Sequence, residues 1–144
     1  MPAFHFYHPI EVRYGDLDPQ GHVNNARYLT YLEQARVAYF GRLGLWDGRL
    51  LHQNRIGIIL ADAHLAFKAP ILLGQDLRVG LRVSRLGNKS LTMEYSLEDG
   101  ENGQELAQAS TVLVAYEYES GRTIPLPDDW REIITAFEGL PLGS

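Results

Sequence analysis

The sequence contains no cysteine among its 144 residues, which excludes disulfide bonds, thiolate metal sites and a cysteine nucleophile. It also lacks any apolar run near the roughly 18 residues that a membrane-spanning helix needs. Its first ten residues have neither the basic nor the apolar region of a signal peptide. We therefore expect a cytoplasmic protein without a membrane partner.

An excess of positive charge is missing as well, because the net charge is −5 at pH 7. A chain of this charge lacks the broad basic surface that binds nucleic-acid phosphates, although a local basic patch could still hold a nucleotide-like group. We expect no nucleic-acid partner. The length fits one domain over residues 1–144, and a chain of this size can bury a core without staples.

The chain begins with a predicted strand over residues 4–14, where apolar and polar residues alternate. Pro9 cannot donate a ladder hydrogen bond, so this strand should lie at a sheet edge or carry a bulge. The stretch that follows, GDLDPQGHVNN, is dense in turn-forming residues and must be a loop.

A single long helix is predicted from about Ala26 to Leu43. Asn24 or Asn25 can cap its first turn, and Gly44 suits its C-terminal end. Its apolar residues cover so broad an arc that the rest of the protein should wrap around it. The residues of this arc are Tyr28, Leu29, Leu32, Ala35, Tyr39, Phe40 and Leu43.

After a loop that holds Trp46 and Asp47, the pattern predicts four more strands and a short terminal helix. The expected strands cover residues 56–69, 77–84, 91–97 and 106–118, with a hairpin turn at 86–89 and the helix at 127–137. The first of these strands should place Ile59, Ala61, Ala63, Leu65 and Phe67 on one face.

These elements predict an α+β fold in which one antiparallel sheet of about five strands curls around the long helix. The last four strands can pair as a meander. The last strand has a face of small residues, which would let a helix approach the sheet closely. Apolar residues remain on both faces of the sheet, so we expect a second copy of the chain to cover part of it.

One loop gathers the residues that could carry chemistry, namely Asp16, Asp18, His22, Asn24 and Asn25. It runs directly into the predicted helix N terminus, where free N–H groups and the helix dipole favour developing negative charge, as on a thioester oxygen under attack. A carboxylate beside such a site can act as a nucleophile or as a base toward water. Acyl transfer is therefore available without serine or cysteine.

From Arg13 to Tyr28 the sequence reads R-Y-x-D-x-D-x-x-G-H-V-N-N-x-x-Y and continues into Y-L-E-x-A-R. This composite motif resembles the 4-hydroxybenzoyl-CoA thioesterase-like branch of the hotdog superfamily, and especially its long-chain acyl-CoA thioesterases. The order of predicted elements is similar over nearly the whole chain. The resemblance implies a hotdog fold and hydrolysis of acyl-CoA to a carboxylic acid and CoA, with no cofactor beyond the CoA of the substrate.

The resemblance also implies the functional residues. Asp18 is the implied catalytic carboxylate, with an oxyanion site at the backbone N–H near Asn25 and an active site at a homodimer interface, in a dimer or a tetramer of dimers. In relatives the CoA phosphates lie near the turn after the third strand, which maps onto Lys89 and Ser90. His22 could orient the loop, contact the substrate or be structural, and we count it among the catalytic candidates.

Further roles stay open from residue type alone. Asp16 is expected to be a turn or scaffold carboxylate. Tyr28 faces the apolar arc, so it is a core residue or a contact to the substrate. Arg36 lies near the middle of the arc, where a guanidinium needs a partner. Glu33, three residues earlier, can form that ion pair or face the cleft and position water or Asp18.

Two other functions are compatible with the sequence. Asp18 and His22 are spaced loosely like the pair of hotdog hydratases and dehydratases, although Pro19-Gln20-Gly21 does not reproduce the motif of that branch. A non-catalytic module that binds acyl-CoA or an acyl carrier is the other alternative. A metal site at Asp16, Asp18 and His22 is not expected, because the remaining ligands of a calcium loop and a second histidine at helical spacing are missing.

Overall fold

The computed structural model describes residues 4–45 and 56–140, so the predicted loop around Trp46 and Asp47 lies outside the described residues. Among the described residues no helix is long and apolar enough to cross a membrane. The elements in chain order are β1 (Tyr7–Ile10), a 3₁₀ turn η1 (Tyr14–Asp16), α1 (Asn25–Arg42), β2 (Ile56–Phe67), β3 (Leu77–Leu86), β4 (Ser90–Asp99), β5 (Glu105–Glu117), β6 (Arg122–Thr123) and α2 (Asp128–Glu138).

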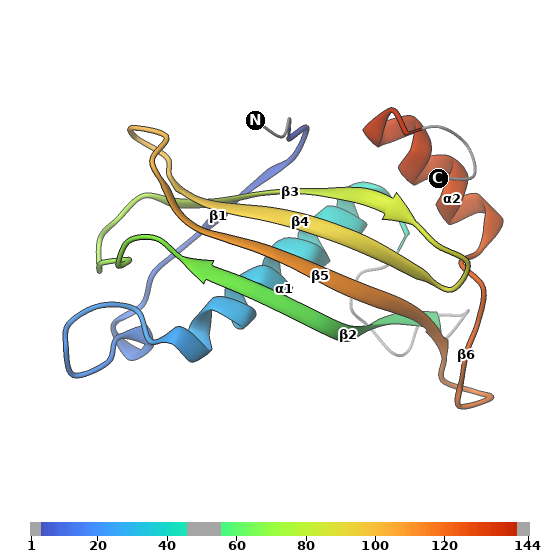
Figure 1. Ribbon diagram of the computed structural model, residues 1–144, viewed down its shortest axis with the longest axis horizontal. Coiled ribbons are helices and arrows are strands. Elements are labelled where there is room, and N and C mark those ends of the chain that lie inside the picture. The colour runs from blue at the N-terminus through green and yellow to red at the C-terminus, as the bar shows by residue number, and fades with distance from the viewer. Residues whose placement is uncertain (1–3, 46–55, 141–144) are drawn as a thin grey trace.

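The strands form one antiparallel sheet in the order β1-β3-β4-β5-β2, and the short β6 adds to β5. Figure 1 shows this sheet curving around α1, with α2 beside the end of the sheet that carries the β3–β4 turn. The predicted architecture, an antiparallel sheet around one long helix, is therefore present. The sheet has six strands rather than about five, and α2 is the terminal helix expected near residues 127–137.

The strand order differs from the predicted meander in one place. β3, β4 and β5 follow one another as hairpins, but β2 pairs with β5 rather than with β3, its neighbour in sequence. Hydrophobic periodicity identifies a strand without naming its partner. As a result β1 and β2 are the two edges of the main sheet, and the edge position predicted for Pro9 is confirmed.

The first strand is shorter than the alternation predicts, because local turn bonds replace ladder bonds at its end. Tyr14 is highly exposed in η1, where the Arg13 N–H donates to the Asp16 side chain. Phe4 also lies on the unexpected side, since its ring and that of Tyr7 cover Gly80 on the sheet face away from α1.

The predicted face of β2 is wrong for its first half. Ile59 pairs with Val114, whereas Ala63 pairs with Thr111. Val114 and Thr111 are three residues apart on a regular strand, so their side chains point to opposite faces. The register shifts around Ala61, an extra residue that forms a β-bulge. The β2 side chains on the helix side of the sheet are therefore Ile58, Leu60, Ala63, Leu65 and Phe67.

Helix α1 forms as its caps predict. The Asn24 side chain accepts the Ala26 N–H at 2.9 Å, and Gly44 follows the last turn with a φ of 73°, in the region that favours glycine. The arc needs two corrections, because Tyr31 is buried although it was left out and Leu29 is exposed. The small residues predicted to let α1 approach β5 are buried: Ala107, Ala109, Thr111 and Ala115.

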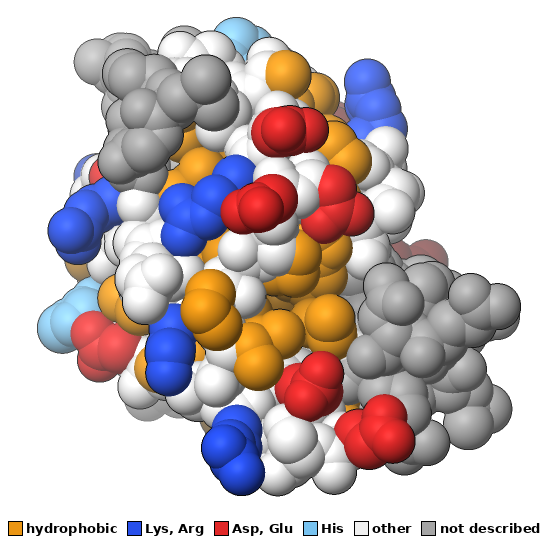
Figure 2. All heavy atoms as spheres, turned by 90° about the vertical axis from the view of Figure 1, so that its right-hand side faces the viewer, with side chains coloured by type: hydrophobic (Ala, Val, Ile, Leu, Met, Phe, Trp, Pro, Cys, Tyr) orange, Lys and Arg blue, Asp and Glu red, His pale blue; other side chains and the backbone are white. Residues whose placement is uncertain are grey.

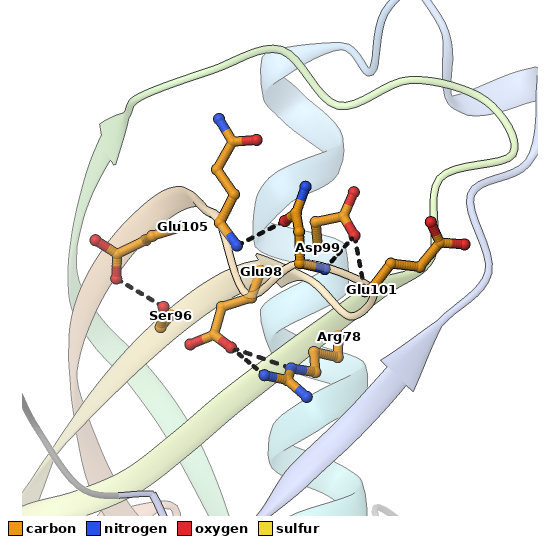
Figure 3. Close-up of polar contacts among 8 residues, drawn as sticks. Arg78, Ser96, Glu98, Asp99, Glu101 and Glu105 are labelled. Carbon is orange, nitrogen blue, oxygen red and sulfur yellow. Dashed lines mark hydrogen bonds and ion pairs between the residues drawn. The ribbon is translucent and has the colours of Figure 1, made fainter.

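The sheet face away from α1 was expected to carry some apolar residues, and it also carries paired polar side chains. Arg78 donates two hydrogen bonds to Glu98, at 3.0 and 2.9 Å, and Ser96 donates to Glu105 at 2.6 Å (Figure 3). Polar side chains on neighbouring strands thus form hydrogen bonds and ion pairs with one another across this face. Exposed apolar side chains lie along the edge strand β2, at Ile59, Leu60 and Phe67, and Ile59 is on the face away from α1.

Candidate active site

The loop before α1 is a short hairpin, which we call the site hairpin and define as residues 16–24. At its base the Asn24 N–H donates to the Asp16 carbonyl at 2.8 Å. One step further out the Asp18 N–H donates to the His22 carbonyl at 2.9 Å. The hairpin leads directly into the first turn of α1, as the turn-forming residues predict.

Asp18 is the more available of the two carboxylates in the site hairpin. Its Oδ1 accepts the Gln20 N–H at 2.9 Å, and its Oδ2 lies 3.8 Å from Nδ1 of His22, too far for a hydrogen bond. The side chain is 21% exposed. Among the described residues nothing donates a hydrogen bond to Oδ2, so this oxygen is open to a substrate or to water.

Asp16 is a scaffold carboxylate, in agreement with its expected role. Its Oδ2 accepts the Arg13 N–H at 3.0 Å and the Tyr31 hydroxyl at 2.7 Å, and its Oδ1 lies 3.8 Å from Nε of Arg27. Burial alone would raise the pKa of Asp16. The two hydrogen bonds and the nearby guanidinium groups outweigh burial and lower that pKa, so the carboxylate stays ionised in its scaffold.

The N terminus of α1 presents a free N–H at Asn25. Asn24 is the cap, and its side-chain and main-chain oxygens accept the N–H groups of Ala26 and Arg27, each at 2.9 Å. Within residues 4–45 and 56–140 no acceptor reaches the Asn25 N–H. A free N–H at a helix N terminus stabilises negative charge, and the oxyanion site was expected at this group.

Tyr28 is a buried residue, as its position on the apolar arc predicts. Its ring packs edge-on against Phe67 at the end of β2, with ring centroids 4.8 Å apart. Burial raises the pKa of Tyr28, so its phenol stays neutral. Phe67 is exposed on its other side and therefore offers an apolar surface beside the start of α1.

Arg36 is buried as predicted, but Glu33 is not its partner. The Arg36 Nη1 donates to the Tyr95 hydroxyl at 3.4 Å, and that hydroxyl lies 2.6 Å from Oγ1 of Thr111. Glu33 is exposed and, among the described ion pairs, makes none with Arg36. The predicted ion pair is wrong because Arg36 reaches inward to the sheet, whereas Glu33 lies further round α1, toward solvent.

Lys89 and Ser90 lie at the opposite end of the sheet from Asp18. Lys89 ends the turn between β3 and β4 and Ser90 begins β4, at a position level with the start of β2. The site hairpin lies near the end of β2, because Tyr28 contacts Phe67 there. β4 has 10 residues and at roughly 3.3 Å per residue separates these ends by about 30 Å.

The turn that carries Lys89 is held by α2. Arg131 donates to the carbonyl oxygens of Gly87 and Asn88, so the turn has a fixed conformation while the Lys89 side chain remains exposed. Figure 2 looks at this end of the molecule and shows basic and acidic side chains interspersed with hydrophobic ones. Phosphate binding here would thus depend on individual cations.

Similarity to known proteins decides the family. The chain matches the thioesterase-like superfamily over residues 12–134. It belongs to this superfamily. A thioesterase from Thermus thermophilus, in a crystal structure with coenzyme A and Zn, is 40% identical with a TM-score of 0.81, covering 98% of this chain and 100% of that one. The predicted resemblance and the hotdog architecture are confirmed at this level, as is the enzyme class, a thioester hydrolase.

Two curated relatives differ in the acyl group that their names carry. The long-chain acyl-CoA thioesterase FadM of Escherichia coli K12 is 27% identical over 130 residues, 85% of this chain and 92% of that protein. The 1,4-dihydroxy-2-naphthoyl-CoA hydrolase of Thermosynechococcus vestitus is 25% identical over 117 residues, 81% of this chain and 80% of that protein. Membership of the superfamily therefore leaves the acyl group of this thioesterase open.

No metal site is evident among the described residues of this thioesterase, because no group of three or more histidine, aspartate or glutamate side chains is arranged to hold a metal.

A groove of about 830 Å³ lies on the sheet face away from α1, lined in part by His64, Arg82, Glu94 and Gln108. No predicted site residue lines this groove.

Two neighbours of the site hairpin in this thioesterase were not predicted from the sequence. Leu72 pairs with His22, and the Val23 N–H donates to the Ile71 carbonyl at 2.8 Å. Tyr31 is the second, through its bond to Asp16. The contact with residues 71–72 is distant in sequence and leaves no mark on periodicity. The burial of Tyr31 on α1 could have been found from its position beside the arc.

Proposed function

We propose that this thioesterase hydrolyses acyl-CoA to a carboxylic acid and CoA, with Asp18 as the catalytic carboxylate. The observation that carries the proposal is the open Oδ2 of Asp18 on a hairpin that leads straight to the free N–H of Asn25. Coenzyme A in the Thermus thermophilus thioesterase and the CoA esters in the names of both curated relatives support CoA as the leaving group.

In the proposed reaction the thioester carbonyl oxygen accepts a hydrogen bond from the Asn25 N–H, which stabilises the negative charge that develops there. Asp18 then acts in one of two ways. In the first, it attacks the carbonyl carbon, the C–S bond breaks and the CoA thiolate leaves; water then opens the resulting mixed anhydride, which releases the acid and restores the carboxylate. In the second, it removes a proton from a water that attacks the carbonyl carbon, and the C–S bond breaks to release the acid and the CoA thiolate. Both routes need an ionised carboxylate near the carbonyl.

We extend the proposal to a homodimer built on β2. This edge strand is 12 residues long and exposes Ile59, Leu60 and Phe67. A long edge strand with apolar side chains and unpaired backbone groups favours pairing with another strand. A two-fold axis that pairs β2 with β2 of a second copy would give the unpaired backbone N–H and C=O groups of both strands hydrogen-bond partners. Both subunits would use the same surface for this contact.

Such a dimer would bring the predicted substrate contacts together. Antiparallel pairing of two β2 strands sets the start of one beside the end of the other. Lys89 and Ser90 of the partner subunit then approach the end of the sheet that carries Asp18, instead of lying about 30 Å away. An acyl-CoA could place its thioester at Asp18 and its phosphates at the partner's Lys89, with Tyr28, Phe67 and the exposed Glu33 beside the acyl group.

The test is release of free thiol from a panel of acyl-CoA esters, read with a thiol dye. Wild-type protein should turn over, and Asp18→Asn should lower kcat by at least about 10²–10³ with an unchanged melting temperature, because asparagine keeps the size and turn bond but loses charge and basicity. Asp128→Asn, on the distant α2, is the matched control. Near-normal turnover by Asp18→Asn would remove Asp18 from the chemistry.

The same assay separates the other function classes. Saturable acyl-CoA binding without thiol release would indicate a binding module, and a change in the acyl chain without thiol release would indicate a hydratase.

A separate experiment distinguishes the two routes through Asp18. Single-turnover hydrolysis in ¹⁸O water labels the enzyme carboxylate only if an anhydride forms and is opened at the Asp18 carbonyl.

A further inference from the structure

Tyr31 connects the site hairpin to the buried side of α1. Its hydroxyl donates to Oδ2 of Asp16 at 2.7 Å, while the residue as a whole is only 2% exposed. Asp16 is the base of the site hairpin, because its carbonyl oxygen accepts the N–H of the helix cap Asn24. A buried side chain of α1 therefore binds the residue at the base of the site hairpin.

We propose that Tyr31 is a positioning residue, which acts through Asp16 to fix the carboxylate of Asp18 relative to the free N–H of Asn25. Its effect on rate rests on the proposed function, whereas its effect on the hairpin does not. A core tyrosine whose hydroxyl only adds stability would not have this effect on Asp18.

The other partners of the Asp16 carboxylate cannot replace this contact. Arg13 donates only its backbone N–H, from the chain segment just before the hairpin, and so gives no anchor to α1. Arg27 is on α1, but its side chain is 50% exposed and its Nε lies 3.8 Å from Oδ1 of Asp16. An exposed pair at this distance is screened by solvent and contributes little. Tyr31 is the buried, hydrogen-bonded link.

Protonation states keep this link in place at neutral pH. Burial raises the pKa of Tyr31, and the hydrogen bond to Asp16 and the charge of that carboxylate raise it further. The pKa of Asp16 is lowered. At neutral pH the hydroxyl therefore donates to an ionised acceptor, which makes the hydrogen bond stronger than one between neutral groups.

The rate should depend on this link because the chemistry needs Asp18 and Asn25 in a fixed relation. A displacement of about 1 Å in a catalytic group can cost about 100-fold in rate. Between Asp16 and Asp18 lies one residue, Leu17, so a shift of the hairpin base moves the carboxylate directly. Substrate binding away from the hairpin should be affected less.

The chain supplies a matched control on the same helix. Tyr39 is also buried on α1, and its hydroxyl donates to Oε2 of Glu138 in α2 at 2.5 Å, at the end of the helix away from Asp18. Both Tyr31→Phe and Tyr39→Phe remove one hydroxyl from a bond to a carboxylate. We expect Tyr31→Phe to lower kcat about 10–100-fold with KM within about 3-fold, and Tyr39→Phe to leave both unchanged.

Two readouts separate positioning from stability. Without the Tyr31 hydroxyl the pKa of Asp16 rises, so the acid limb of the kcat profile should move to higher pH in Tyr31→Phe but not in Tyr39→Phe. If Tyr31 acts through Asp16, the double variant Tyr31→Phe/Asp16→Asn should be no slower than the slower single variant. Additive losses, or equal kcat for the two tyrosine variants, would overturn the proposal.

Hydrogen exchange tests the hairpin without any activity. The N–H groups of Asp18 and Asn24 are bonded across the hairpin, and both should exchange faster in Tyr31→Phe than in wild-type protein or Tyr39→Phe. Equal protection in all three proteins would overturn the link even if the thioesterase assay succeeds. Conversely, if wild-type protein released no thiol, the proposed function would fail while faster exchange still upheld the link.

Discussion

His22 and Asp18 face each other across the site hairpin, with Nδ1 of His22 3.8 Å from Oδ2 of Asp18. The distance allows an electrostatic attraction when the imidazole is protonated but not a hydrogen bond. Both side chains are partly exposed, so solvent weakens the attraction. In this geometry His22 influences the carboxylate without relaying a proton from it directly.

Replacing His22 should therefore cost less than replacing Asp18. We expect His22→Ala to lower kcat by no more than about 10-fold, because a screened pair of this kind contributes about 1 kcal/mol or less. His5→Ala is the control, since the exposed His5 ring packs edge-on against Phe137 of α2, with ring centroids 6.1 Å apart. Steady-state kinetics on one acyl-CoA measures both. A loss as large as that of Asp18→Asn would make His22 a direct participant.

Lys89→Ala should raise KM for CoA esters with little change in kcat. A phosphate contact remote from the thioester contributes the same binding energy to the ground state and the transition state. Added salt should raise KM of the wild type and have less effect on the variant. Arg42→Ala removes the same charge from the end of α1, where Arg42 lies over the Phe137 ring, and should leave KM unchanged. Unaltered KM in Lys89→Ala would place the phosphates elsewhere.

Asp16→Asn should destabilise the fold in a pH-dependent manner. The pKa of Asp16 is lower in the folded protein than in the unfolded chain, so its carboxylate stabilises the fold where it is ionised. This contribution disappears as pH falls through the folded-state value. We expect a loss of about 1–3 kcal/mol in unfolding free energy at pH 7, which shrinks as the pH falls below about 4. Urea unfolding at several pH values measures it, and a difference that stays constant with pH would contradict the expectation.

The β2 edge should decide the oligomeric state. Light scattering at micromolar concentration should give a mass of at least twice the 16.2 kDa of one chain. Ile59→Lys places a charge on that edge and should shift the protein toward the monomer. Ile133→Lys on α2 is the control, since both isoleucines are 37% exposed. A wild-type protein found only at the mass of one chain would end the dimer proposal.

Local signals predicted most of the fold correctly. The cap at Asn24, Gly44 after the helix and the turn at residues 86–89 each act over a few residues, and their elements lie where the sequence places them. The pairing of β2 with β5 and the bulge at Ala61 depend on contacts far apart in sequence. Periodicity contains no record of such contacts.

The candidate site shows the same division. The sequence alone gathers Asp16, Asp18 and His22 in one loop, and the structure holds them in one hairpin. The two carboxylates differ in their contacts, because the buried Tyr31 donates to Asp16 whereas Oδ2 of Asp18 accepts no hydrogen bond from a described residue. This difference depends on which side chains face the core. The wrong partner for Arg36 arose likewise, because helical spacing allows Glu33 but only the sheet supplies Tyr95.

The bulge at Ala61 changes which residues of β2 face α1: these are even-numbered residues before the bulge and odd-numbered residues after it. Gly57 lies under the Tyr118 ring, where an added Cβ would come within 2.7 Å of that ring. Deleting Ala61 would join Leu60 directly to Asp62, whose partners Leu113 and Val112 are already adjacent on β5. All other pairs would keep their partners, Gly57 would stay beneath Tyr118 and Leu60 would still point toward α1. β2 therefore contains one residue more than its ladder with β5 needs, and deletion of Ala61 should be tolerated better than deletion of a paired residue such as Leu65.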